Sequence, residues 1–416
     1  MLRCVKKRVV LILFLLLPGI VQGQKYVTCN SLDDAFKKHL RVTSLSLGYH
    51  KLTKLTNRIG ELANLRSLFV NNNQISSLPS EIGNLVQLER LILKYNTLAS
   101  LPPQIGRLKN LINLEICCNY LDSLPPEIGK LTNLKNLRAS NNQLTSLPRQ
   151  IQKLANLHTL WLDNNQLVTL PPQIGHLKSL AVLYLKNNSL NTLPKSFTKL
   201  KSLQMLSLSY NKFTKISLKL GKLSRLEWLN LDHNQLAELP NSIWKLAKLH
   251  TLFLHKNKFK RLSENIGKLV QLKTLSLAEN ELSYLPAQIS RLKKLEKLYL
   301  DQNQFSQLSK NIGSLTQLKI LVLSKNRLTS LPNSIRKLVN LERLYITQNR
   351  LTKLSGAIGK LTQLKELYLN NNQLSTLPWT IRKLTHLKLL HLRGNPISAK
   401  EKARIRKLLP HTKIYF

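Results

Sequence analysis

The hydrophobic positions of this chain repeat with a fixed 23-residue period. Counted from Asn73, aliphatic residues or Phe stand at +2, +5, +9, +12, +15, +18 and +20, while Pro is frequent at +6 and Gly at +10. The opening position recurs without insertion or deletion from His50 to Asn395, sixteen times in all. One such unit cannot bury its own apolar face, so units of this length must stack on one another to form a core. The period therefore predicts a single elongated solenoid over residues 42–395.

Each unit is predicted to contribute one short strand. The apolar residues at +18 and +20 flank an outward position, so the units together form a parallel sheet of about sixteen strands. The Pro at +6 lacks an N–H and suits an irregular return on the outer side. The Asn that opens each unit lies where the strand leaves the sheet, and its amide can bond backbone groups that the turn leaves unpaired. This Asn ladder comprises Asn73, Asn96, Asn119, Asn142, Asn165, Asn188, Asn211, Asn234, Asn257, Asn280, Asn303, Asn326, Asn349, Asn372 and Asn395.

The first residues of the chain lie outside the repeat. Residues 1–23 place basic residues before the apolar run from Val9 to Leu17 and end on Val21-Gln22-Gly23, an order typical of a secretory signal peptide. A membrane anchor is disfavoured because the run is shorter than the roughly 20 residues that a spanning helix needs and is followed by Pro18. We therefore expect a signal peptide at 1–23 and no transmembrane segment after its cleavage.

Both ends of the solenoid are predicted to carry a cap. Residues 24–41 contain a helical stretch with Asn30 or Ser31 as N-cap, and this N-terminal cap helix shields the first strand. Residues 396–416 place Ser398 and Glu401 at the spacing of a capping box, followed by a helix and a terminal strand.

The repeat unit also carries a family resemblance. The pattern LPxxIGxLxxLxxLxLxxNxL resembles the 23-residue leucine-rich repeats. The ending NPISAKEKARIRKLLPHTKIYF is similar to that of the secreted leucine-rich repeat proteins of spirochaetes such as Leptospira, and the likeness covers essentially the whole chain. It implies an α/β horseshoe with a concave parallel sheet, an irregular, 3-10 or short-helical convex side, and helical caps. It also implies a bacterial protein that binds its ligand outside the cell, with no catalytic residues to carry over.

Charge adds a second feature, because 64 Lys and Arg stand against 20 Asp and Glu and give a net charge of +44. Position +11, on the outer side, is Lys or Arg in eleven of fifteen units. We interpret this basic flank either as a binder of an anionic glycan or lipid headgroup, or as a solvated face that keeps the protein soluble. Nucleic acid would bind such a stripe only weakly and without specificity. The basic flank comprises Arg107, Lys130, Lys153, Lys199, Lys222, Lys245, Lys268, Arg291, Lys337, Lys360 and Lys383.

The concave side carries aromatic residues. Position +19 points out of the sheet, because its neighbours point in, and it is aromatic in seven of sixteen units. Exposed rings on a rigid sheet favour a protein interface, although cross-strand packing that only stiffens the sheet is the alternative. Trp228 at +17 and the polar Asp163 and Lys186 at +21 extend this surface. The candidate partner-binding residues are Phe69, Trp161, Asp163, Tyr184, Lys186, Trp228, Phe253, Tyr299, Tyr345 and Tyr368.

Catalytic and metal-binding motifs are missing from the sequence: it contains no Walker loop, no GxGxxG and no HExxH. Ser209, Asp232 and His255 stand on successive units, but a triad needs His between the nucleophile and the acid, and here Asp lies between them. Cys117 and Cys118 have no metal-binding neighbours in the stack, so we expect free thiols. A lipoprotein site at Cys29 is disfavoured because the preceding residues are not small.

Together these patterns predict a secreted, periplasmic or outer-surface protein that binds a protein partner through its concave face. The alternative is an anionic glycan or lipid headgroup on the basic flank. We expect no enzymatic activity, no cofactor and no metal. An effector enzyme that uses the repeats only for targeting is disfavoured, because the repeats leave no residues for a catalytic domain.

Overall fold

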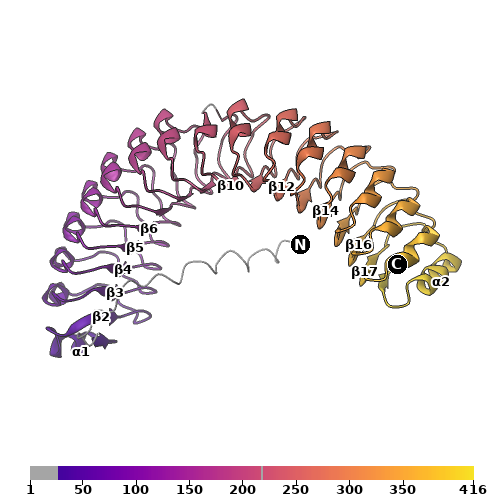
Figure 1. Cartoon of the computed structure of the whole chain (residues 1–416). Helices are drawn as coiled ribbons and strands as arrows, with labels where there is room; N and C mark the ends of the chain where they lie inside the picture. Colours follow the sequence, from indigo (N-terminus) through magenta and orange to yellow (C-terminus); the bar gives the residue numbers. More distant parts are fainter. Residues whose placement is uncertain (1–26, 217–218) are drawn as a thin grey trace, which may run out of the picture.

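A computed structural model of the chain describes residues 27–216 and 219–416. The chain forms a curved solenoid whose concave face is one parallel sheet, with short helical turns on the convex side (Figure 1). The predicted signal peptide, residues 1–23, lies outside the described residues. Within the described part, no helix has both the length and the apolar character needed to cross a membrane.

The sheet is built from strands that pair in chain order, each parallel to the next. In β7 and β8, for example, Leu160 pairs with Leu183 and Trp161 with Tyr184. The repeat strands are β2 (Val42–Ser46), β3 (Ser67–Phe69), β4 (Arg90–Ile92), β5 (Asn113–Glu115), β6 (Asn136–Arg138), β7 (Thr159–Trp161), β8 (Val182–Tyr184), β9 (Met205–Ser207), β10 (Trp228–Asn230), β11 (Thr251–Phe253), β12 (Thr274–Ser276), β13 (Lys297–Tyr299), β14 (Ile320–Val322), β15 (Arg343–Tyr345), β16 (Glu366–Tyr368) and β17 (Leu389–His391).

The convex side returns each repeat through a 3-10 helix. In most repeats the Pro at +6 is its N-cap: Pro79, for instance, has an extended backbone with φ −68° and ψ 151°. The helices are η1 (Asn57–Glu61), η2 (Ser80–Asn84), η3 (Pro103–Arg107), η4 (Pro126–Lys130), η5 (Arg149–Lys153), η6 (Pro172–His176), η7 (Lys195–Lys199), η8 (Leu220–Lys222), η9 (Asn241–Lys245), η10 (Glu264–Lys268), η11 (Ala287–Arg291), η12 (Lys310–Ser314), η13 (Asn333–Lys337), η14 (Gly356–Lys360) and η15 (Trp379–Lys383). The predicted fold class is confirmed.

One continuous hydrophobic core runs the length of the solenoid between the sheet and the 3-10 helices. The aliphatic residues of the repeat pattern fill it, and the largest fully buried side chains are Phe197, Phe213, Phe259 and Phe305. Each repeat therefore covers the apolar face of its neighbours, which fixes which side chains can face outward.

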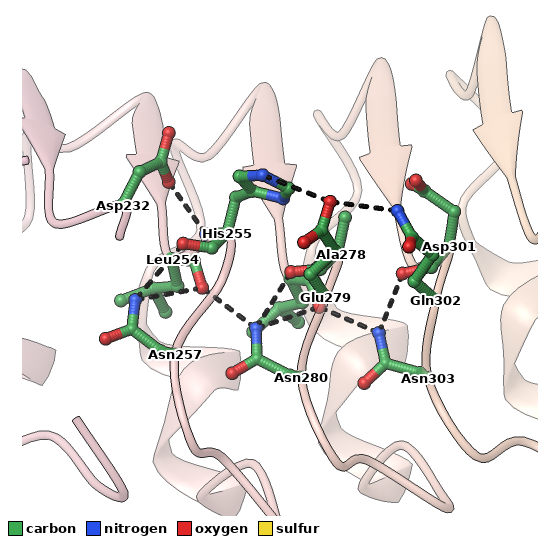
Figure 2. Close-up of polar contacts among 11 residues, drawn as sticks. Asp232, Leu254, His255, Asn257, Ala278, Glu279, Asn280, Asp301, Gln302 and Asn303 are labelled. Atoms are coloured by element: carbon green, nitrogen blue, oxygen red, sulfur yellow. Dashed lines mark hydrogen bonds and ion pairs between the residues drawn. The ribbon is translucent and has the colours of Figure 1, made fainter. Parts of the chain in front are cut away.

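The Asn ladder closes the turn after each strand. Asn234 is 8% exposed, and its amide nitrogen donates to the backbone oxygens of Leu208, Leu231 and Asp232 at 3.0, 3.1 and 3.2 Å. Its side-chain oxygen accepts the N–H of Phe213 at 3.1 Å. One side chain thus pairs backbone groups of two repeats, and Asn257 and Asn280 repeat this pattern (Figure 2).

The residue before each ladder Asn adopts a left-handed backbone conformation, which the sequence pattern does not signal. These residues include Tyr95, Cys118 and Lys256, with φ of 58°, 59° and 53°. Such values are unfavourable for residues other than glycine, so the surrounding hydrogen bonds must hold the turn in place. Among the described residues, only Gly394 supplies a glycine at this position.

The N-terminal cap differs from the prediction for residues 24–41. Val27–Cys29 forms a strand, β1, parallel to β2, and only Leu32–Lys37 is helical, as α1. Ser31 is the N-cap of α1, and its hydroxyl accepts the N–H of Asp34 at 3.2 Å. The sheet therefore begins one strand earlier than the repeat, because the unpaired edge of β2 is covered by another strand as well as by a helix.

The C-terminal cap consists of α2 (Ala399–Leu408) and β18 (Lys413–Tyr415), which pairs in parallel with β17. Ser398 accepts the N–H of Glu401 at 3.2 Å, as in a capping box. The Glu401 carboxylate, however, accepts the N–H of Leu377 at 3.0 Å and pairs with Arg404 at 2.6 Å. Glu401 is used to attach α2 to the last repeat. With β1 and β18, the sheet has 18 strands.

Candidate binding surface

The concave surface is lined by three columns of outward side chains, at +17, +19 and +21 of each repeat. On β7, Leu160 is fully buried at +18 whereas Trp161 at +19 is half-buried. Because every strand has the same register as the next, side chains of one column lie side by side on neighbouring strands. The columns therefore convert a regular spacing in sequence into direct contact.

Four aromatic residues form a central aromatic group: Trp161, Tyr184, Trp228 and Phe253. Their rings meet edge to face, with centroids 5.2 Å apart for Trp161 and Tyr184, 6.1 Å for Tyr184 and Trp228, and 5.9 Å for Trp228 and Phe253. The Tyr184–Trp228 contact spans β9, which lies between β8 and β10, and the Tyr184 hydroxyl lies 3.8 Å from the sulfur of Met205 on β9. The +17 and +19 columns thus merge into one aromatic strip from β7 to β11.

A C-terminal aromatic group consists of Tyr345, Tyr368, His391 and Tyr415. Adjacent rings stack with centroid distances of 4.6, 4.5 and 4.5 Å and interplanar angles of 15° or less. Tyr345 also donates its hydroxyl to Glu366 at 3.0 Å. The repeat spacing predicted Tyr345 and Tyr368 on this surface but not Tyr415. The 23-residue period would pair His391 with Ile414, whereas the structure pairs it with Tyr415, one residue later.

Two predicted aromatic residues lie apart from these groups. Phe69 pairs in register with Ser46 and Ile92, and Tyr299 with Ser276 and Val322. Both are half-buried in the +19 column. They belong to the same face, but the structure does not bring them into either aromatic group.

The +21 column adds charge beside the central aromatic group. Asp163 accepts the backbone N–H of Lys186 at 2.7 Å, and burial raises the pKa of Asp163 to about 6. The ammonium of Lys186 lies 5.0 Å from the centre of the Tyr210 ring, in a cation–π contact. The two polar residues expected beside Trp161 and Tyr184 are therefore joined through backbone and do not form an ion pair with each other.

A polar chain continues across β10 to β13 (Figure 2). Asp232 accepts the backbone N–H of His255 at 2.7 Å, and burial raises the pKa of Asp232 to about 7. The ring Nε2 of His255 lies 3.6 Å from Glu279, which accepts from the Gln302 amide at 2.9 Å. No sequence pattern signals this desolvation of Asp232, because it depends on how deeply the folded chain buries the carboxylate.

The same contacts exclude a triad of Ser209, Asp232 and His255. The Asp232 carboxylate meets the backbone of His255, whereas the ring of His255 faces Glu279. The hydroxyl of Ser209 lies 3.2 Å from that of Ser207. These residues therefore lack the proton path that a triad requires.

The basic flank has a regular origin on the convex side. Each of its eleven members is the last residue of a 3-10 helix and is exposed. The stem of Arg107 passes over Gly83 and that of Lys130 over Gly106, and a Cβ added at either glycine would lie 3.2 Å from the Cδ of the basic side chain. It would also lie 2.8 Å from a backbone oxygen of the next repeat. Glycine at +10 therefore leaves room for both the neighbouring backbone and the basic stem.

The cysteines form no disulfide among the described residues. Cys29 is buried in β1, and Cys117 and Cys118 lie partly exposed after β5. Burial and the adjacent Cys118 raise the pKa of Cys117 to about 12, which disfavours a reactive thiolate. Within the described part of the chain, no group of three or more His, Cys, Asp and Glu side chains is arranged to hold a metal ion.

Known structures share this architecture. A leucine-rich repeat protein of Leptospira interrogans is 36% identical over 94% of this chain and 100% of its own, with a TM-score of 0.79. The plant peptide hormone receptor RGFR1 in complex with RGF2 is 28% identical over 89% of this chain and 65% of its own, with a TM-score of 0.70. The functional domain of InlJ from Listeria monocytogenes is 25% identical over 81% and 69%, with a TM-score of 0.67.

Sequence comparison agrees with the structural one. No curated protein sequence matches the chain significantly. A family model described as a leucine-rich repeat region matches residues 29–140, 126–238, 211–307 and 302–409. These overlapping matches cover the whole solenoid, residues 42–395. The chain therefore belongs to the leucine-rich repeat family.

Proposed function

We propose that this protein binds a protein partner through its concave face. We also propose that it is secreted or is exposed on the cell envelope. The observation that carries the proposal is the continuous edge-to-face strip of Trp161, Tyr184, Trp228 and Phe253 on a rigid sheet. Large rings held in place lose little entropy on binding, and Trp and Tyr are frequent interface anchors. Related folds support this use, since the RGFR1 structure contains the peptide RGF2.

The proposal assigns the protein a scaffold role without catalysis. It is supported by the geometry of Ser209, Asp232 and His255, which does not connect as a triad. A location outside the cytoplasm is supported by the signal-peptide pattern of residues 1–23.

Site-specific photocrosslinking tests the concave assignment. A photoreactive amino acid replaces Asn230, on the concave end of β10, or Asn241, at the start of η9 on the convex side. Each protein is mixed with solubilised cell-surface proteins and irradiated. The proposal predicts a discrete adduct from position 230 and none from position 241. An adduct from position 241 alone would contradict it.

A second candidate function is anion binding by the basic flank. The observation that favours it is the packing of the Arg107 and Lys130 stems over the glycines of the preceding repeats, which holds these stems against the convex surface. Charge reversal of Lys199, Lys222, Lys245, Lys268 and Arg291 should then lower the salt concentration that elutes the protein from heparin. Unchanged elution would leave the flank as solvated surface.

A further inference from the structure

The concave +21 column contains a regular series of carboxylates. Asp163, Asp232 and Asp301 are each separated by three repeats, and they follow β7, β10 and β13. Adjacent strands lie about 4.8 Å apart, so three repeats separate neighbouring members by roughly 14 Å. The series runs beside the central aromatic group, whose rings lie on β7 to β11.

The fold itself does not need the charge of these residues. Asp163 and Asp232 each use one oxygen to accept a backbone N–H of the next strand, at 2.7 Å. Asn370, which stands three repeats after Asp301 in the same column, makes the same bond with Arg393 at 2.9 Å through a neutral amide. A neutral side chain is therefore sufficient for the structural role.

The negative charge of these three carboxylates also destabilises the folded protein. Burial raises the pKa of Asp163 to about 6 and of Asp232 to about 7, and it raises the pKa of Asp301 as well. None of the ion pairs within the described residues involves any of the three, whereas Glu115 on the same face pairs with Lys94 and Arg138. Ser140, which precedes Asp163 in the column, is 8% exposed, and its hydroxyl has no hydrogen-bond partner among the described residues.

We propose that these three carboxylates receive the cationic side chains of an extended segment of the partner protein, with Lys or Arg at every fourth position. An extended chain rises about 3.4 Å per residue, so residues i and i+4 lie on the same side about 14 Å apart. This rise matches the spacing of Asp163, Asp232 and Asp301. The inference rests on the proposed function and specifies the chemistry of its partner.

Local charge is consistent with a cationic segment despite the net charge of +44. Around the three carboxylates, the end of the concave face carries Asp163, Asp232, Glu279 and Asp301 against Lys186, Lys256 and Lys325, the last of which acts on Asp301 from the next repeat. The basic flank lies on the opposite, convex side, and physiological salt screens exposed charges beyond about 8 Å. The partner segment therefore meets a locally acidic strip bordered by aromatic rings.

Two labelled nonapeptides test the proposal against the full chain. Both are capped at their ends and carry three Arg among serines, one with Arg at positions 1, 5 and 9 and the other with Arg at positions 1, 4 and 7. Their charge is equal, so a difference in fluorescence anisotropy reports spacing and not general attraction. We expect the first to bind about tenfold more tightly, because only its cations can form all three charge-assisted contacts together.

Protein variants identify the residues responsible. Asp163→Asn, Asp232→Asn and Asp301→Asn combined should abolish the preference between the peptides. Glu115→Gln, which removes a concave carboxylate already paired with Lys94 and Arg138, should preserve it. Equal affinity for both peptides, or a preference that survives the triple variant, would overturn the inference. A partner that crosslinks at position 230 yet binds the triple variant normally would refute this inference and leave the proposed function intact.

Discussion

The carboxylate of Asp232 accepts the backbone N–H of His255 at 2.7 Å, and this bond does not offset the desolvation of the acid. Burial raises its pKa from an ordinary value near 3.8 to about 7, with Lys186 as the nearby charge that opposes the shift. Tyr210, His233 and His255 lie around it. The charged form is therefore less favourable in the folded protein than in the unfolded chain.

This relationship predicts a pH-dependent effect of Asp232→Asn. The folded-state pKa is raised, so wild-type stability relative to the variant falls as pH rises from about 4 to about 7. At pH 8 the variant should melt about 1–3 °C higher than wild type, since the amide keeps the hydrogen bond without the charge. The advantage should be gone near pH 4. Melting curves of both proteins across this range measure the difference. A difference between Asp232→Asn and wild type that does not change with pH would contradict this explanation.

Asn234→Ala tests the Asn ladder. The side chain makes four hydrogen bonds to the backbone of two repeats, so its removal leaves buried N–H and C=O groups unpaired. The free energy of unfolding should fall by roughly 1–3 kcal/mol. Chemical denaturation measures this, with the exposed neighbour Gln235→Ala expected to change little. A loss of only a few tenths for Asn234→Ala would mean that water replaces these bonds.

The C-terminal cap provides a separate test. Ending the chain at Asn395 removes α2 and β18, which uncovers the core beneath Ile405 and Leu409 and the edge of β17. Aggregation or a lower melting temperature is expected. Because a truncated chain can fail for other reasons, Ile405→Ala is the milder variant, and it should cost about 2–5 kcal/mol. Normal melting of both proteins would refute a stabilising role for the cap.

The repeat period was sufficient to predict the parallel sheet and the outward columns, because residues one period apart become direct neighbours. The period did not predict the positions of residues outside the regular 23-residue spacing. Tyr415 stands one position later than the period assigns after His391, since α2 intervenes, so the periodic pattern did not identify a ring that completes a stack. It also failed for β1, which lies before the first repeat and has no periodic signal.

The sequence predicted which side chains lie in each column better than it predicted their protonation and their contacts. Asp163 could be placed beside Trp161 from spacing, but the desolvation of Asp163 and Asp232 depends on the packing of several side chains in space. The Tyr184–Trp228 contact likewise crosses from one column to another and skips a strand. Such contacts follow from side-chain size and direction and not from the repeat alone.

The most direct measurement for the concave assignment is titration calorimetry with the partner that crosslinking identifies. Its affinity for wild type is compared with its affinity for the double variant Trp161→Ala with Tyr184→Ala. The variant Tyr345→Ala with Tyr368→Ala tests the C-terminal aromatic group in the same way, and Lys222→Ala with Lys245→Ala is the convex control. The account predicts a loss of about 2 kcal/mol or more in binding for at least one concave variant, normal melting, and little change for the control. Unchanged affinity in both concave variants, with normal melting, would contradict the concave assignment, and a loss in the convex variant would favour the basic flank.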